Sequence, residues 1–213
     1  GSDISTTNNG GFNALMLAAN SGHLKVVKTL IDAGADVNAK NNDGFSALDL
    51  AAYNEYPEIV RGLINAGANT DAMETALYIV KNVENYSEKH HRIFQLLNIA
   101  LGTDDTISLT EAADRGYPEV VKLLVDRGGD IIVEDEYGNT ALIKAVEEGY
   151  QEIAKTLIDA GADVNARDGN NDTVLMHAVD KEYPKLVKTL IDSGANVNAK
   201  SNGGTALILA TYK

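Results

Sequence analysis

The hexapeptide GADVNA occupies Gly34–Ala39 and occurs again, unchanged, at Gly161–Ala166. Close variants, GANTDA and GANVNA, begin at Gly67 and Gly194. The first glycines of these segments, together with Gly128 of a related GGD stretch, follow one another at steps of 33, 61, 33 and 33 residues. A fixed period of this length is typical of repeat architectures, in which each repeat stacks on its neighbours.

A second marker keeps the same period: a leucine that opens a short apolar stretch. Its successive steps are 33, 29, 32, 33, 33 and 32 residues. The marker leucines are Leu15, Leu48, Leu77, Leu109, Leu142, Leu175 and Leu207. Because two independent markers share one period, we interpret the chain as six repeats followed by a half-repeat.

Each repeat reads as a helix, a tight turn, a second helix and a loop. In the first repeat, the apolar stretch Ala14–Ala19 ends before Gly22. A second apolar stripe runs from Val26 to Ile31, and Gly34 ends the helix that carries it. A side-chain oxygen two residues before the marker leucine is suited to cap the first helix. The expected caps are Asn13, Ser46, Thr75, Thr140, Thr173 and Thr205.

Prolines and glycines fall at fixed phases of the repeat. Every proline lies where the second helix should begin, because a missing N–H costs nothing in the first turn. These prolines are Pro57, Pro118 and Pro184. Four residues before the marker leucine, Gly11, Gly44, Gly138 and Gly203 suit a turn with positive φ, and Asn171 takes that phase in the sixth repeat.

The third repeat departs from the period. The step from Leu48 to Leu77 indicates that about four residues of the preceding loop are missing, and about four extra residues lie within Asn85–His90. We interpret this irregular repeat, about residues 73–102, as two longer helices between shortened loops. It is either a drifted repeat or a functional element, namely a notch in the row of loops or a hinge between residues 1–72 and 103–213.

Composition excludes several classes of protein. The formal charge is −13 and the sequence pI is about 4.6, which disfavours binding to nucleic acid or an anionic membrane. There is no cysteine, so disulfides, thiolate nucleophiles and Cys-ligated metals are excluded. No window approaches about 18 consecutive apolar residues, so no membrane-spanning helix is expected.

The repeat resembles the ankyrin repeat. Two copies read GFNALMLAANSGHLKVVKTLIDAGADVNAK, at residues 11–40, and YGNTALIKAVEEGYQEIAKTLIDAGADVNAR, at residues 137–167. The resemblance implies an all-α solenoid of helix-turn-helix repeats whose loops project as β-hairpin fingers. It covers one domain at residues 8–213, with six repeats and a C-terminal half-repeat, after a tag remnant and leader at residues 1–7. Tyr56, Tyr117, Tyr150 and Tyr183 replace a structural histidine of the family and are expected to pack.

The resemblance also implies a function, which is protein binding through finger tips and the exposed ends of first helices. A non-catalytic interaction module or scaffold that binds its partner on the concave face is therefore expected; the alternative is the targeting arm of a larger enzyme or effector. The partner-binding residues expected by repeat phase are Phe12, Asn42, Asp43, Phe45, Tyr53, Asn54, Asp114, Arg115, Glu136, Tyr137, Asn139, Glu147, Glu148, Asp172, Asp180 and Lys181.

Two features of this expected surface have alternative readings. Phe12, Phe45, Tyr53 and Tyr137 are candidate anchors, although Phe12 and Phe45 could instead pack against neighbouring fingers. The acidic cluster formed by residues 134–136 and 147–148 is either solvated surface or a patch for a basic partner. We expect a protein partner, no nucleic acid, no membrane, and a monomeric chain.

No enzymatic site is apparent in the sequence. The adjacent His90 and His91 cannot face one site and are expected on the surface, while His177 is expected to be structural or to line the concave face. The loop 168–172 lacks the glutamate of a calcium loop, so we assign it to turn chemistry. No catalytic residue, cofactor or metal is predicted.

The sequence also bears on covalent modification and on cellular compartment. The resemblance implies that the asparagine of the GADVN motif can be hydroxylated in animal relatives, at Asn38, Asn165 and Asn198. Gly1-Ser2 is typical of a cloning remnant, so a signal peptide could have been removed. A soluble protein is expected, with the cytoplasm favoured.

Overall fold

A computed structural model describes residues 4–103, 106–202 and 204–206. Within these ranges the chain forms twelve helices in six consecutive pairs and one short strand pair. The helices are α1 (Ala14–Asn20), α2 (Leu24–Asp32), α3 (Ala47–Tyr53), α4 (Pro57–Asn65), α5 (Thr70–Lys81), α6 (Glu88–Leu101), α7 (Leu109–Asp114), α8 (Pro118–Asp126), α9 (Ala141–Glu147), α10 (Gln151–Asp159), α11 (Val174–Asp180) and α12 (Pro184–Asp192). The all-α repeat fold predicted from the period is confirmed.

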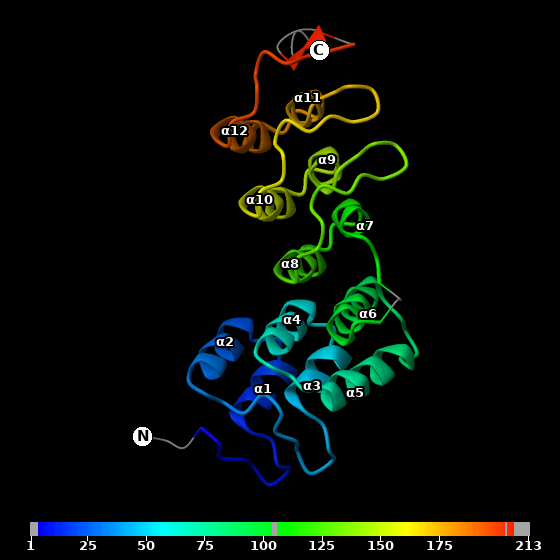
Figure 1. Cartoon of the computed structure of the whole chain (residues 1–213). Coiled ribbons are helices and arrows are strands. Elements are labelled where there is room, and N and C mark those ends of the chain that lie inside the picture. The colour runs from blue at the N-terminus through cyan, green and yellow to red at the C-terminus, as the bar shows by residue number, and fades with distance from the viewer. Residues whose placement is uncertain (1–3, 104–105, 203, 207–213) are drawn as a thin grey trace. The chain divides into compact units, whose positions relative to one another are not determined.

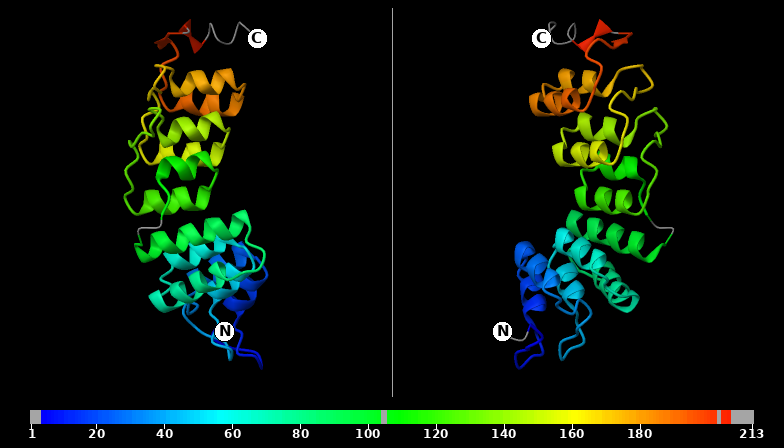
Figure 2. Two further views of the ribbon diagram at one scale, coloured as in Figure 1. Left: turned by 90° about the vertical axis from the view of Figure 1, so that its right-hand side faces the viewer. Right: turned by 60° about the vertical axis from the view of Figure 1, so that its left-hand side comes forward.

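The helices belong to two compact units, Gly1–Thr106 and Ile107–Lys213. In the N-terminal unit, first helices α1, α3 and α5 pack in one row and second helices α2, α4 and α6 in another. The C-terminal unit repeats this arrangement with α7, α9 and α11 beside α8, α10 and α12 (Figures 1 and 2). Small residues such as Ala19, Ala51 and Ala113 are buried in the first helices, which lets the rows approach closely.

Most expected helix signals are confirmed. The side chains of Asn13, Ser46, Thr140 and Thr173 accept a hydrogen bond from the backbone N–H three residues on. All three prolines begin a second helix. Asn171 has φ of 69°, as its phase indicated.

The third repeat has the two long helices that its sequence indicated, but its boundaries differ from those expected. Helix α5 begins directly after Asn69, whose side chain accepts from Ala72 N–H, so the preceding finger is missing altogether. Thr75 is therefore not a cap: it lies inside α5 and its hydroxyl donates to the Asp71 carbonyl. The expected insertion also partly belongs to α6, because this helix already begins at Glu88.

The tyrosines that begin second helices pack over glycines of the preceding repeat. A Cβ atom on Gly22 would lie 2.6 Å from the ring of Tyr56. A Cβ on Gly116 would lie equally close to the ring of Tyr150, and both glycines have positive φ. The packing role predicted for these tyrosines is confirmed, and it explains why glycine occupies the turn.

The fingers are loops rather than extended hairpins. Isolated bridges such as Glu134–Thr140 and Arg167–Thr173 close them at the base. Among the fingers within the described residues, only the last has paired strands, β1 (Lys200–Ser201) and β2 (Gly204–Thr205), which are antiparallel. The expected half-repeat helix at Leu207–Lys213 and the glycine at 203 lie outside the described residues.

Candidate functional site

An asparagine or aspartate shapes the tip of each of four fingers. In each, its side-chain oxygen accepts hydrogen bonds from the backbone N–H groups two and four residues on. Asp135 does so from Tyr137 (2.9 Å) and Asn139 (2.8 Å), and Asn41 does so from Asp43 (3.0 Å) and Phe45 (2.9 Å). Asn8 and Asp168 repeat the pattern. This turn fixes the direction in which the finger aromatics leave the backbone.

The expected binding residues of the N-terminal unit divide into exposed and structural ones. Tyr53, at the end of α3, is 65% exposed, and the finger residues Asn42, Asp43 and Phe45 are exposed as well. Phe12 is half-buried. Asn54 is also half-buried, because its Nδ2 donates to the Asn20 side chain (3.1 Å) and the Leu50 carbonyl (2.8 Å).

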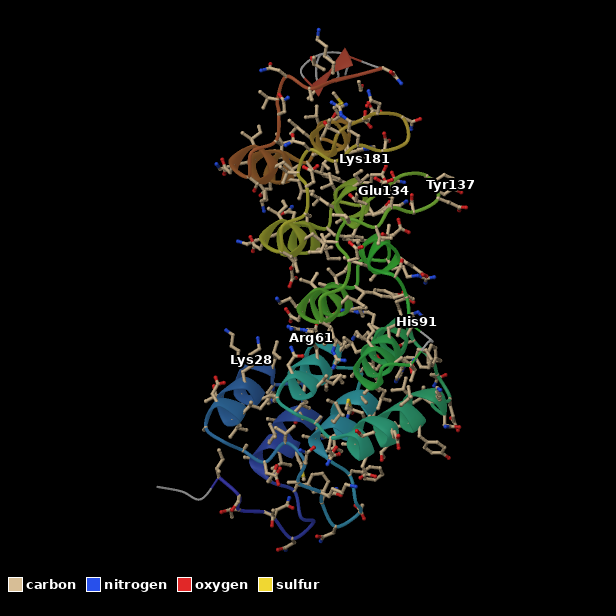
Figure 3. The ribbon with its side chains drawn as sticks, in the orientation of Figure 1. Lys28, Arg61, His91, Glu134, Tyr137 and Lys181 are labelled. Atoms are coloured by element: carbon tan, nitrogen blue, oxygen red, sulfur yellow. The ribbon has the colours of Figure 1, made fainter. Side chains whose placement is uncertain are left out.

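In the C-terminal unit, Tyr137 is 68% exposed and projects from the finger between α8 and α9 (Figure 3). Glu147 and Asp172 are half-buried. Asn139 is buried, contrary to the exposure expected of a contact residue, because its amide donates to Asp135 inside the finger. The remaining expected residues of this unit are exposed: Asp114, Arg115, Glu136, Glu148, Asp180 and Lys181.

The acidic cluster expected in the fifth repeat is partly neutralised by Lys144 of α9. Its Nζ lies 3.4 Å from Asp114, 3.7 Å from Asp135 and 3.9 Å from Glu147. Partial burial works against the charged form, but the three carboxylates outweigh it and raise the pKa of Lys144. Partial burial also works against the charged form of Asp135. The hydrogen bonds that its carboxylate accepts from Asn139 and Tyr137 outweigh this effect and lower the pKa of Asp135. These residues form a charge network that joins α7, α9 and a finger.

His177 extends this network to α11. Its Nδ1 lies 3.4 Å from Glu147 and its Nε2 lies 3.3 Å from Asp168. The Asp168 carboxylate thus serves both its own finger turn and the contact with His177. The turn role predicted for loop 168–172 is confirmed.

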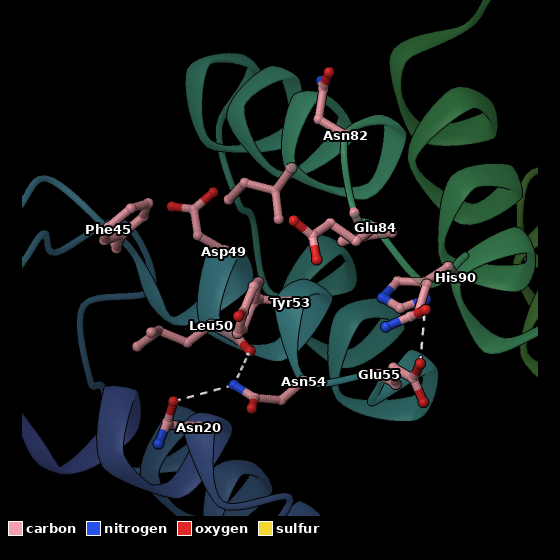
Figure 4. A pocket seen from close by; sticks show the side chains of 13 residues that line it. Asn20, Phe45, Asp49, Leu50, Tyr53, Asn54, Glu55, Asn82, Glu84 and His90 are labelled. Carbon is pink, nitrogen blue, oxygen red and sulfur yellow. Dashed lines mark hydrogen bonds and ion pairs between the residues drawn. The ribbon is translucent and has the colours of Figure 1, made fainter. Parts of the chain in front are cut away.

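The N-terminal unit contains an open groove, most of whose lining residues the sequence did not indicate. It holds about 1030 Å³ and is bounded by the ends of α1 and α3 on one side and by the loop from α5 to α6 on the other (Figure 4). Phe45 and Tyr53 supply aromatic surface, and Asp49, Glu55 and Glu84 supply carboxylates. Because the finger before α5 is missing and the loop after it is long, the irregular third repeat builds one wall of this groove.

Asp49 is the least expected residue of the groove. It is 1% exposed and occupies the repeat phase that holds the buried Met16, Ile143 and Met176 elsewhere. Its Oδ2 accepts from the N–H and the hydroxyl of Ser46, both at 2.7 Å, whereas Oδ1 is buried without a hydrogen-bond partner. Burial raises the pKa of Asp49, and the bonds from Ser46 oppose that rise.

His90 is buried, which corrects the expectation that it lies on the surface. It is 4% exposed and occupies the first turn of α6, where its Nδ1 lies 3.2 Å from the Ser87 N–H nitrogen in a capping box. The same Nδ1 lies 3.2 Å from Glu55, a residue at φ of 62° where the first, fourth and fifth repeats have glycine. His90 Nε2 is buried without a hydrogen-bond partner.

Sequence reasoning missed Asp49, Glu55, Glu84 and His90 as groove residues. One signal was available for Asp49, because it is a charged side chain at a phase that holds methionine or isoleucine in the first, fifth and sixth repeats and so breaks the apolar pattern. No comparable signal existed for Glu84, since the irregular repeat shares no phase with its neighbours.

Two of the asparagines expected to be modified, Asn38 and Asn165, connect successive repeats. Asn38 Nδ2 donates to the Gly67 carbonyl (3.1 Å), and its Oδ1 accepts from Asn69 N–H (2.8 Å). Asn165 makes the equivalent bonds to the next repeat: its Nδ2 donates to the Gly194 carbonyl (3.4 Å) and its Oδ1 accepts from Asn196 N–H (2.7 Å). Asn198 is exposed. Hydroxylation at these positions stays a prediction.

Comparison with known families agrees with the repeat geometry. A family model described as ankyrin repeats, in three copies, matches residues 1–74 and 83–168, and a single ankyrin repeat matches residues 170–202. The chain belongs to the ankyrin-repeat family. The first of these matches breaks off at residues 75–82, within the irregular third repeat. No curated protein matches this ankyrin-repeat chain as a relative.

Ankyrin repeats are in general protein-binding modules and are typically non-catalytic. In the described part of this ankyrin-repeat chain, no group of three or more His, Asp or Glu side chains is arranged to hold a metal ion. None of the helices in residues 4–103, 106–202 and 204–206 has the length and apolar character needed to cross a bilayer.

Proposed function

We propose that this ankyrin-repeat chain is a non-catalytic module that binds a protein partner on its concave face, with its acidic charge favouring a basic partner surface. The exposure of Tyr53 and Tyr137 carries the proposal. One ring lies at the end of a first helix and the other at a finger tip. Large exposed aromatics that contribute little to their own core are the residue type that anchors protein interfaces.

The charge distribution supports a basic partner surface. Around Tyr137, the exposed carboxylates of Glu136 and Glu148 lie on the same finger and helix end, outside the ion pairs of Lys144. Around Tyr53, the groove residues Asp49 and Glu84 add further negative charge. Complementary charge of this kind accelerates encounter and selects among partners more than it adds affinity.

The test is a pull-down from the source proteome with the native chain and a Tyr53→Ala/Tyr137→Ala variant. We expect the variant to lose the captured partners or to bind them at least about tenfold more weakly, as is typical of anchor residues. Tyr78→Ala is the matched control, because Tyr78 is equally exposed but is neither a residue of the groove lining nor one of the expected binding residues. Identical partners and affinities for the native chain and the double variant would refute the proposal.

A further inference from the structure

We propose that the groove of the N-terminal unit binds a lysine side chain from an extended segment of the partner protein, with Asp49 beneath its floor and Tyr53 and Glu84 at its rim. This inference deepens the proposed function and rests on it. It identifies the chemistry that one part of the binding face recognises, and it gives the irregular third repeat a role.

The floor of the groove holds a negative charge that the protein only half satisfies. Asp49 keeps one carboxylate oxygen within the capping box of α3, and the other has no hydrogen-bond partner. Lys40 acts on Asp49 electrostatically, but its Nζ is already 2.6 Å from Asp71. A buried carboxylate in this condition attracts a cation strongly, because little water screens it.

The rim adds charge of the same sign. Glu84 is exposed in the loop after α5, and among the described residues no lysine or arginine pairs with it. Glu55, by contrast, lies 3.2 Å from the Nδ1 of His90. Figure 4 shows Asp49, Tyr53 and Glu84 reaching the groove from α3 and from the loop opposite. The lining therefore complements a cation.

The shape and the apolar walls favour lysine over arginine. Leu50, Ile79 and Val83 line the groove, and a lysine stem can lie along such surface while its ammonium group reaches a carboxylate. One unpaired oxygen at the floor suits a point charge, whereas a guanidinium fork is best matched by two oxygens in one plane. The faces of Tyr53 and Phe45 attract a cation as well. The volume of about 1030 Å³ leaves room for neighbouring residues of an extended segment.

The experiment uses the full chain and fluorescent peptides of alternating lysine and alanine, with arginine and glutamine peptides of the same length for comparison. Binding is measured by fluorescence anisotropy, and its place by chemical-shift changes in the amide NMR spectrum. We expect the lysine peptide to bind most tightly, the glutamine peptide not to bind, and the largest shifts at Tyr53 and Glu84.

Two variants locate the effect. Asp49→Asn keeps an oxygen for the bonds from Ser46, and it should weaken lysine-peptide binding on the order of tenfold. Glu84→Gln changes an exposed loop, so it tests the rim without risk to folding. Asp32→Asn, on the exposed end of α2, is the matched charge control and should change binding by less than about twofold.

Equal binding of the lysine peptide to the native chain and to both groove variants would overturn the inference, as would equal or tighter binding of the arginine peptide. Absence of lysine-peptide binding would overturn it too. If the pull-down nevertheless captures partners through Tyr53 and Tyr137, the proposed function stands while the groove assignment falls.

Discussion

Gly116 shows how single residues decide whether one repeat can pack on the next. It has φ of 70° in the turn between α7 and α8, and the ring of Tyr150 occupies the space that a Cβ atom would need. Gly128, at the end of α8, has φ of 78° but open space around it. Substitutions at these two glycines therefore distinguish the cost of backbone strain from the cost of overpacking.

We predict that Gly116→Ala lowers the free energy of unfolding by about 2–4 kcal/mol, because left-handed strain and overpacking act together. Gly128→Ala should cost only about 1 kcal/mol, the strain alone. Urea unfolding followed by circular dichroism measures both. Equal losses of unfolding free energy for the two variants would show that the Tyr150 ring can move aside without an energetic cost.

Asp49 makes stability depend on pH in the direction opposite to most carboxylates. Burial raises its pKa in the folded protein, so the folded state holds this proton more tightly than the unfolded chain does. The free energy of unfolding should therefore fall as the pH rises from below the ordinary value of 3.8 through the raised folded pKa.

We predict that Asp49→Asn gains stability relative to the native chain as the pH rises from acid to neutral, because the variant has no proton to lose at this site. Urea unfolding at a series of pH values measures the difference. Asp32→Asn, which changes an exposed carboxylate, provides the reference. A difference between Asp49→Asn and the native chain that shrinks or stays constant with pH contradicts the expected sign.

At the scale of the element, helix α5 shows why a helix start cannot be placed by counting residues. The period put the cap of the third repeat at Thr75, but Asn69 supplies it, because the chain enters the helix directly from the preceding turn without a finger. The helix is thus 12 residues long, against 7 for α1 and α3.

We predict that Asn69→Ala lowers the free energy of unfolding by about 1 kcal/mol, the usual loss for an N-cap. Thr75→Ala should leave it unchanged or raise it by up to about 0.5 kcal/mol, because alanine is the better helix former inside a helix. Thermal and urea unfolding of both variants distinguish the two positions. A larger loss of stability for Thr75→Ala than for Asn69→Ala would mean that Thr75, the position that the period indicated, is the cap.

At the scale of the whole molecule, the dominant quantity is the net charge of −13. In the C-terminal unit, the Lys144 ammonium lies within 4.0 Å of three carboxylates. The groove of the N-terminal unit has no such compensation from lysine or arginine among its lining residues. Excess charge of one sign destabilises a compact chain by self-repulsion.

We predict that added sodium chloride raises the melting temperature at neutral pH by a few degrees, equivalent to about 1 kcal/mol, because screening weakens this repulsion. Near the pI of about 4.6, the same salt should have little effect. Differential scanning calorimetry at both pH values measures the two responses. A melting temperature that falls with salt at neutral pH would mean that attractive ion pairs outweigh the repulsion.

The sequence alone determined the repeat, its helix pairs and most of its caps, because these depend on residues within a few positions of one another. The cap Asn13 at the start of α1 and Pro57 at the start of α4 could both be interpreted before any contact was known. Exposure of Tyr53 and Tyr137 also followed from repeat phase.

Tertiary structure decided the rest. It buried Asn139 within its finger, brought Lys144 among carboxylates from other elements, and assembled the groove from α3 and the irregular third repeat. The physical reason is that helix caps and turns depend on neighbouring residues in the sequence, which recur in every repeat. The energy of a buried charge such as Asp49 depends instead on which distant segments surround it. Where the period breaks, packing alone places those segments.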